Sequence, residues 1–204
     1  MSLLHWINQI DQELFLFLNG QHIPFLDQVM WLISGKFLWL PMYLVIIYFL
    51  VRERRSRVWI TLIAVALIIL LSDQLSVMVK DVVHRLRPSH NPLLLNLIHL
   101  VKEPGGNEYR AGTYGFVSSH AANTFALATF VSLFFARKWL TIAIFIWAAI
   151  VSYSRIYLGV HYPLDVVGGA MVGTFAGAII FYLERFVQQK YFKDASPQPL
   201  EKGQ

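Results

Sequence analysis

Long runs of apolar residues alternate with short clusters of charged residues along most of the chain. A helix that spans a bilayer needs ~20 mainly apolar residues, and long polar side chains at its ends can reach the interface. The uncharged runs therefore predict five spanning helices in an all-α, polytopic membrane helix bundle. These helices are expected to cover residues 37–52, 58–79, 117–136, 139–157 and 163–184.

The positions of Lys and Arg predict how the bundle is oriented. If five helices alternate in direction, the basic clusters at 52–57, 137–138 and 185–202 all lie on one face. Positive residues collect on the cytoplasmic side of a membrane. That face is therefore assigned to the cytoplasm, and residues 88–116 form one long outer (periplasmic) loop.

The N-terminal segment 1–35 follows a different pattern. Its first part has apolar residues at helical spacing with polar residues between them, which is typical of an amphipathic helix. A second short helix is expected at 25–35. The two helices could lie flat on the outer surface or together make a sixth crossing, and we favour the interfacial arrangement. The apolar positions are Leu3, Ile7, Ile10, Leu14 and Phe17.

The remaining organisation is simple. Residues 1–192 are expected to form a single membrane domain, and 193–204 a disordered cytoplasmic tail. Gly169, Gly173 and Gly177 recur every four residues in the last predicted span. Such a stripe of small residues allows a neighbouring helix to approach closely, so we interpret it as a packing surface.

Composition agrees with a membrane protein. The hydrophobic fraction is 56% and the charged fraction 14%, whereas an ordinary soluble domain has ~25% charged residues. The absence of cysteine excludes disulfides, thiolate nucleophiles and zinc–sulfur sites. The formal net charge of +5 is distributed as flanks of apolar helices, which indicates membrane lipids rather than nucleic acid as partners.

Polar side chains that a membrane tolerates poorly gather at the predicted outer ends of the helices. Taken alone, each group has an ordinary explanation as an interfacial anchor or a helix cap. Together they bring three cations, two histidines and one carboxylate to one face, a combination suited to a phosphate dianion. A dinuclear metal site would need several carboxylates, so no metal or cofactor is expected. The group comprises Lys80, Arg87, Ser118, Ser119, His120, Arg155, His161 and Asp165.

The pair His161 and Asp165 carries the most specific chemistry. A spacing of four residues places both side chains on one helical face. A carboxylate that accepts a hydrogen bond from one imidazole nitrogen fixes the tautomer and leaves the other nitrogen as a base or nucleophile. We therefore favour metal-free phosphoryl transfer through histidine. A capping aspartate beside a packed histidine is the structural alternative.

These residues resemble the three-part signature of the type 2 phosphatidic acid phosphatase (PAP2) superfamily, which is Lys-x6-Arg-Pro, Pro-Ser-Gly-His and Ser-Arg-x5-His-x3-Asp. The first part is complete in residues 80–88 and the third in residues 154–165. In the second, residues 117–120, Val117 replaces proline and Ser119 replaces glycine. Because Ser119 keeps its backbone N–H, we expect a modified anion site rather than a lost one.

The resemblance implies a role for each residue. His161 would attack phosphorus and form a phosphohistidine, and Asp165 would orient it. His120 would protonate the leaving oxygen and then activate water. The phosphate oxygens would be held by Lys80, Arg87, Ser118, Ser119 and Arg155. Outside the signature, we expect His84, Arg85 and His90 to lie in a solvated outer loop.

The implied activity is hydrolysis of a lipid phosphate or diphosphate at the outer face of a bacterial cytoplasmic membrane. Candidate substrates are undecaprenyl diphosphate, phosphatidylglycerol phosphate, phosphatidic acid and lipid A phosphates. One alternative is a transporter or flippase that only binds anionic lipid. Another is a vanadium haloperoxidase, which has a similar site, although that group is generally soluble.

Overall fold

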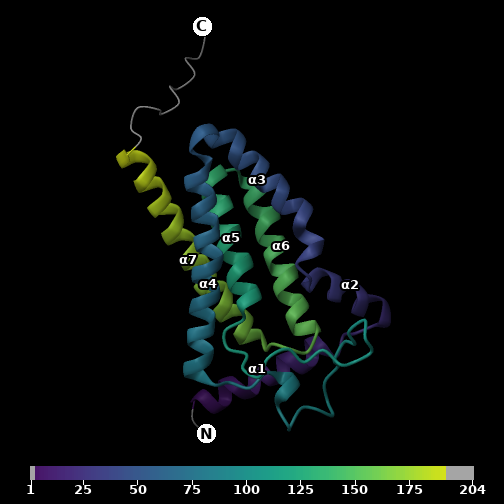
Figure 1. Ribbon diagram of the computed structural model, residues 1–204. Helices are drawn as coiled ribbons and strands as arrows, with labels where there is room; N and C mark the ends of the chain where they lie inside the picture. Colours follow the sequence, from purple (N-terminus) through teal and green to yellow (C-terminus); the bar gives the residue numbers. More distant parts are fainter. Residues whose placement is uncertain (1–2, 192–204) are drawn as a thin grey trace.

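The computed structural model describes residues 3–191 and shows an all-α fold, as the hydropathy pattern predicts (Figure 1). The predicted tail 193–204 lies outside the described residues. Short 3₁₀ turns precede α3 (Phe37–Trp39) and α4 (Arg55–Arg57), and a third, Pro88–His90, begins the outer loop. The α-helices are α1 (Leu3–Asn19), α2 (Pro24–Ser34), α3 (Leu40–Arg54), α4 (Val58–Val83), α5 (Ser119–Phe135), α6 (Lys138–Tyr157) and α7 (Pro163–Tyr191).

Helices α3 to α7 run alternately up and down and correspond to the five predicted spans (Figure 1). Helix α4 extends four residues beyond the predicted end at 79, because Lys80 and Asp81 interrupt the apolar pattern without breaking the backbone helix. Helix α7 also extends beyond 184. There Glu184 is buried, accepts a 2.8 Å hydrogen bond from Thr61 Oγ1 and lies 3.3 Å from Arg54 Nη2. The partnered carboxylate allows the packed helix to continue.

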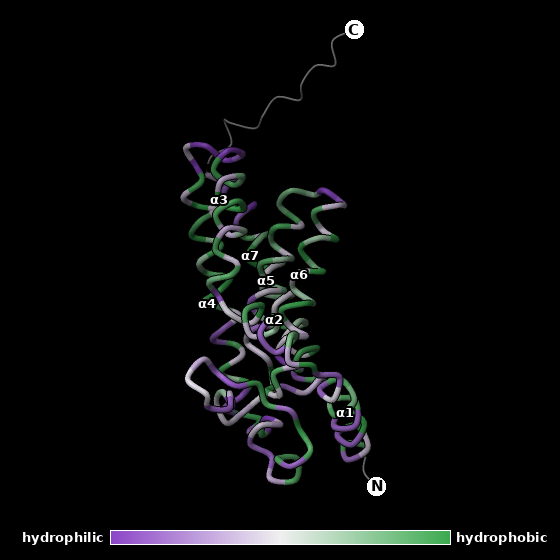
Figure 2. Tube along the Cα trace, turned by 90° about the vertical axis from the view of Figure 1, so that its right-hand side faces the viewer, coloured by the Kyte–Doolittle hydropathy of each residue, from purple (hydrophilic) through white to green (hydrophobic). Residues whose placement is uncertain are grey.

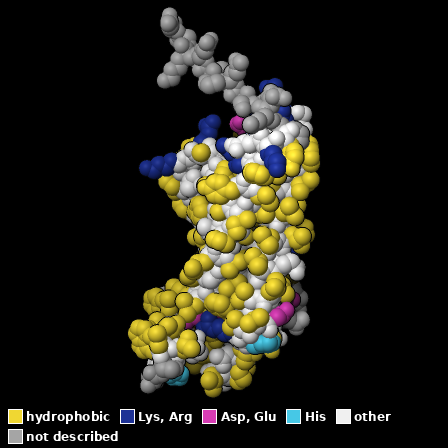
Figure 3. All heavy atoms as spheres, turned by 90° about the vertical axis from the view of Figure 1, so that its left-hand side faces the viewer, with side chains coloured by type: hydrophobic (Ala, Val, Ile, Leu, Met, Phe, Trp, Pro, Cys, Tyr) yellow, Lys and Arg dark blue, Asp and Glu magenta, His cyan; other side chains and the backbone are white. Residues whose placement is uncertain are grey.

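Apolar side chains cover the middle of the bundle, and polar residues concentrate at its two ends (Figures 2 and 3). The segments 37–83, 138–157 and 163–191 are long and apolar enough to cross a membrane. The first contains both α3 and α4, and α5 is a shorter apolar helix. Lys and Arg side chains gather at the end where α3 joins α4, which is opposite the outer loop (Figure 3).

Close contact between α5 and α7 forms the centre of the fold. A Cβ atom added to Gly173 would lie 2.1 Å from the Ala122 carbonyl oxygen, and one on Gly177 would lie 2.4 Å from that of Ala126. Only glycine permits this separation, so the predicted packing role of the glycine stripe is confirmed. The same contact brings the two helix N-termini together, where the Ser118 N–H donates a 2.9 Å hydrogen bond to the Asp165 carbonyl.

Helix α1 lies across the end of the bundle that carries the outer loop (Figure 1). Its predicted apolar face points away from the protein: Leu3 is 70% exposed and Phe17 is 64% exposed. The face that packs on the bundle instead presents Asp11, Phe15 and Asn19, which are all buried. An apolar face turned outward suits contact with lipid, and the interfacial position of α1 stays a prediction.

The outer loop returns to the bundle beside its own beginning. The Arg87 N–H donates to the Thr113 carbonyl at 3.0 Å, and the Gly115 N–H donates to the Arg85 carbonyl at 2.8 Å. These antiparallel hydrogen bonds hold the segment after α4 against the segment before α5. Residues far apart in the sequence thereby meet next to the N-terminus of α7.

We predict that Gly173→Ala lowers the thermal stability of the detergent-solubilised protein. In an open helix position the change would stabilise by ~1 kcal/mol through helix propensity. Against the Ala122 backbone the added methyl forces α7 away from α5, and overpacking of this kind costs ~1–3 kcal/mol. The midpoint of thermal unfolding measures the effect, and Thr174→Ala at the adjacent exposed position is the control. An unchanged or higher midpoint for Gly173→Ala would contradict the packing role.

Candidate active site

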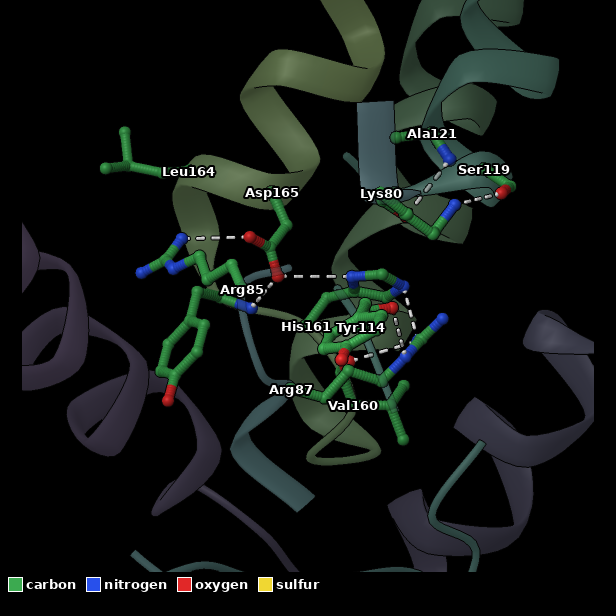
Figure 4. Close-up of polar contacts among 12 residues, drawn as sticks. Lys80, Arg85, Arg87, Tyr114, Ser119, Ala121, Val160, His161, Leu164 and Asp165 are labelled. Atoms are coloured by element: carbon green, nitrogen blue, oxygen red, sulfur yellow. Dashed lines mark hydrogen bonds and ion pairs between the residues drawn. The ribbon is translucent and has the colours of Figure 1, made fainter. Parts of the chain in front are cut away.

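The pair His161 and Asp165 lies buried at the start of α7 (Figure 4). His161 Nδ1 is 3.2 Å from Asp165 Oδ2, and the same oxygen accepts a 3.0 Å hydrogen bond from the Tyr162 N–H. Proline at the first helical position is tolerated, so Pro163 allows the helix to begin between the two residues. With Nδ1 donating to the carboxylate, Nε2 is the unprotonated nitrogen of the neutral imidazole and can accept a hydrogen bond.

Arg87 faces that second nitrogen. Its Nη1 is 2.7 Å from His161 Nε2, and its other hydrogen bonds go to the backbone carbonyls of Tyr114 and Val160. Burial, followed by the charge of Arg155, lowers the pKa of Arg87 to about 10, so the guanidinium remains charged at neutral pH. A fixed cation therefore lies directly beside the unprotonated nitrogen.

Lys80 and Ser119 meet at the facing ends of α4 and α5 (Figure 4). Lys80 Nζ donates a 2.6 Å hydrogen bond to Ser119 Oγ, which is also 2.6 Å from Ser76 Oγ. A glycine at position 119, as in the signature, could not make either contact. The serine thus holds the ammonium group of Lys80 at the rim of the site.

Arg155 reaches the site from the end of α6. Its two terminal nitrogens donate to Ser34 of α2 and to the Tyr109 hydroxyl, the latter at 2.9 Å. Its Nε is buried without a hydrogen-bond partner among the described residues. A buried guanidinium N–H rarely stays unpaired, so this donor is available to an anion.

The N-terminus of α5 contributes Ser118 and His120. Ser118 is buried and caps the helix by accepting from the Ala121 N–H. His120 lies near Arg155 and His161, and it lines a cavity of about 330 Å³. First-turn N–H groups such as those of Ser119 and His120 have no acceptor within the helix. The structure thus brings all eight predicted residues to one end of the bundle.

The expectation that Arg85 lies in a solvated loop is wrong. Its side chain is only 17% exposed and forms ion pairs with Asp165 (2.9 Å) and Asp11 (2.6 Å). Neither Arg85 nor Asp11 was predicted from the sequence to belong to the site. Asp11, Phe15 and Asn19 recur every four residues, so they share one face of α1. This spacing could have indicated a packed face, but the polar residues between the apolar positions are more typical of a face turned to solvent.

Gly115 lies against the side chains of Asp165 and Arg87, where a larger residue would not fit. A Cβ atom there would lie 2.7 Å from Asp165 Oδ2 and 3.3 Å from Arg87 Cγ. The returning loop can therefore pass close to the Asp165 carboxylate and the aliphatic part of the Arg87 side chain because this residue lacks a side chain. Among the described residues, no group of three or more His, Cys, Asp or Glu side chains is placed to bind a metal ion.

Comparison with known proteins agrees with this geometry. Residues 61–188 match the model of the PAP2 superfamily. The chain belongs to the PAP2 superfamily. It is 40% identical to the lipid A 4′-phosphatase of Bacteroides thetaiotaomicron, over 89% of this chain and 80% of that protein. It is 36% identical to the lipid A 4′-phosphatase of Porphyromonas gingivalis, over 95% and 81% of the two chains. This PAP2 protein is therefore a phosphatase.

Solved structures show the same PAP2 architecture. The crystal structure of Aquifex aeolicus LpxE superposes with a TM-score of 0.64 at 27% identity, covering 84% of this chain and 94% of that one. The PAP2-type phosphatidylglycerolphosphate phosphatase of Bacillus subtilis superposes with a TM-score of 0.67 at 21% identity, covering 93% and 89%. Together with the apolar helices, these similarities identify the chain as a membrane protein.

We predict that the imidazole of His161 stays neutral well into the acidic range. Burial is the largest cause that lowers its pKa well below 6.5, and the charges of Arg87, Arg155 and Lys80 lower it further. Histidine-selective isotope labelling with NMR titration measures the pKa, and His161→Asn assigns the signal. Arg87→Gln should raise the pKa, because it removes the nearest cation. A pKa at or above 6.5 in the parent protein would contradict this electrostatic environment.

Proposed function

We propose that the protein removes a phosphate group from a membrane lipid at the outer face, through a phosphohistidine on His161 and without a metal ion. The observation that carries this proposal is the buried pair with Asp165, which leaves His161 Nε2 unprotonated beside Arg87. A neutral imidazole nitrogen next to a fixed cation can attack a phosphorus whose oxygens that cation neutralises.

The first half-reaction forms a bond between His161 Nε2 and phosphorus while the bond to the lipid oxygen breaks. His120 gives its proton to the departing oxygen, so the lipid leaves as a neutral alcohol or, from a diphosphate, as a protonated phosphate. In the second half-reaction His120 takes a proton from water, whose oxygen attacks phosphorus. The N–P bond then breaks, which releases inorganic phosphate and regenerates the neutral imidazole of His161.

The cations supply electrostatic stabilisation. Lys80, Arg87 and Arg155 approach the same volume from α4, the outer loop and α6. Phosphoryl transfer is catalysed mainly by positioning and charge neutralisation, and these side chains are already held by hydrogen bonds before substrate binds. The unpaired Nε of Arg155 provides a further donor toward a phosphate oxygen.

An apolar cavity accounts for a lipid substrate. The cavity that His120 lines continues between α3, α4, α5 and α6, with walls that include Trp39, Ile46 and Leu127. Since His120 protonates the departing oxygen, the leaving group lies on this side, and its apolar chain can enter the cavity. The basic residues at 52–57 and 137–138 lie at the opposite end of the bundle, which supports a cytoplasmic position for that end and an outer one for the site.

Within the lipid class we favour a phosphorylated lipid A. Both of the relatives described above are lipid A 4′-phosphatases. Undecaprenyl diphosphate is the second candidate, because a 30% identical relative from Sulfolobus acidocaldarius is an undecaprenyl-diphosphatase. The leaving group would then be a lipid phosphate instead of a sugar hydroxyl.

We predict that the purified protein releases inorganic phosphate from lipid A in detergent micelles, at a rate unaffected by EDTA. His161→Ala should lower the rate by ~10³-fold or more, because the nucleophile is lost. His22→Gln, an exposed histidine outside the site, is the control. Undecaprenyl diphosphate, phosphatidylglycerol phosphate and phosphatidic acid complete the panel. Full activity in His161→Ala would refute the mechanism, and lipid movement across vesicles without phosphate release would favour a flippase.

We predict that a phosphoenzyme forms during turnover and disappears in His161→Ala. Rapid alkaline quenching of a reaction with ³²P-labelled lipid should trap a phosphoryl group that is stable in base and released in acid, as expected of a phosphoramidate. In His120→Ala both half-reactions lose their proton transfer, so turnover should fall by ~10²–10⁴-fold. A base-labile label, or label retained in His161→Ala, would place the phosphoryl group on another residue.

A further inference from the structure

Arg85 connects the catalytic pair to helix α1. Its Nη1 donates to Asp165 Oδ1 at 2.9 Å, and its Nη2 donates to Asp11 Oδ2 at 2.6 Å. The guanidinium carbon also lies 4.2 Å from the centroid of the Tyr162 ring. The donors of a guanidinium lie on separate nitrogens with fixed directions, so Arg85 can bridge two carboxylates and hold their relative orientation, which an ammonium group on a flexible stem does less rigidly.

Asp11 fixes the other end of the connection. Its Oδ1 accepts a 2.9 Å hydrogen bond from the Leu164 N–H, one of the first-turn amides of α7 that has no acceptor within its own helix. A carboxylate from α1 therefore caps the helix that carries Asp165. Phe15, one turn further along α1, packs edge-on against Tyr162 with ring centroids 5.3 Å apart.

These contacts leave Asp165 with little freedom. Its Oδ1 faces Arg85, and its Oδ2 faces the Tyr162 N–H and His161 Nδ1. If the Arg85 guanidinium moves, the carboxylate rotates and the imidazole loses its orientation. Neither Arg85 nor Asp11 lies beside His161 Nε2, where the reacting phosphorus would be.

We propose that Asp11 and Arg85 are positioning residues for phosphoryl transfer, so that α1 is a functional part of the active site. Asp11 orients Arg85, Arg85 orients Asp165, and Asp165 orients His161. This inference rests on the proposed role of His161 as nucleophile. It assigns a catalytic contribution to an N-terminal helix that lies outside the three signature blocks.

The kinetic test compares two conservative variants with a matched control. Asp11→Asn keeps an oxygen acceptor for the Leu164 N–H but loses the charge that pairs with Arg85. Arg85→Lys keeps the charge but loses the fork. Each should lower kcat by ~10–100-fold, by analogy with residues that orient metal-ligating histidines, with KM within about twofold of the parent value. Glu13→Gln, also on α1 but bonded within the described residues only to Gln9, should leave kcat unchanged.

A pH profile separates positioning from a general structural effect. Asp11→Asn removes a negative charge near the catalytic pair, so the acidic limb of kcat/KM, which reports protonation of His161, should move to lower pH. Arg85→Gln removes a positive charge, so the limb should move to higher pH. A purely structural role predicts no such opposite shifts. The charged and titratable groups that face His161 from the packed elements are Lys80, Arg87, His120, Arg155 and Asp165.

Phosphate release from lipid A, or from whichever lipid of the panel the parent protein hydrolyses fastest, is the readout, with thermal unfolding midpoints as the check on folding. Reduced kcat, unchanged KM and opposite pH shifts support the proposal. Parent-like kcat in both conservative variants overturns it while leaving the phosphatase mechanism intact. Equal activity of the parent and His161→Ala would instead refute the proposed function on which it rests.

Discussion

The contacts of Asp165 are the ones on which the rest of the site depends. The two carboxylate oxygens contact the His161 ring, the Tyr162 amide and the Arg85 guanidinium, and the backbone carbonyl accepts from the N-terminus of α5. A charge placed this deeply costs several kcal/mol unless it is paired and hydrogen bonded. Through these contacts Asp165 holds together the start of α7, the start of α5 and the segment after α4.

That arrangement requires α5 and α7 to lie very close, and the glycine stripe makes this possible. Bulkier side chains at 169, 173 and 177 would separate the helices and pull the Ser118 N–H away from the Asp165 carbonyl. Packing in the membrane-embedded half of the bundle thus determines hydrogen-bond geometry at its polar end. In lipid, close van der Waals contact of this kind takes the place of hydrophobic association between helices.

The helices could be predicted from the sequence because uncharged runs are a local pattern, and the structure brings the eight candidate site residues to one end of the bundle, while their catalytic roles stay a proposal. Uncharged runs define the spans, and the spacings from Lys80 to Arg87 and from Arg155 to Asp165 are short-range patterns. The pairing of Arg85 with Asp11 could not be predicted, since it joins segments 74 residues apart that have no shared pattern. An amphipathic pattern also does not indicate which face of a helix packs against the rest of the protein. In α1 the apolar face is exposed and the face with Asp11, Phe15 and Asn19 packs on the bundle.

Position 119 departs from the glycine of the signature, and the serine there makes contacts that a glycine cannot make. Glycine allows a backbone to approach phosphate, and Ser119 keeps the N–H that would make that contact. Its hydroxyl adds a bond to Lys80, with Ser76 as a third partner. A long flexible lysine loses rotamer freedom when it binds a ligand, and part of that entropic cost is already met when the side chain is held in place. The serine therefore fills space that a glycine would leave open beside the proposed phosphate site, and its hydroxyl holds the Lys80 ammonium group in place.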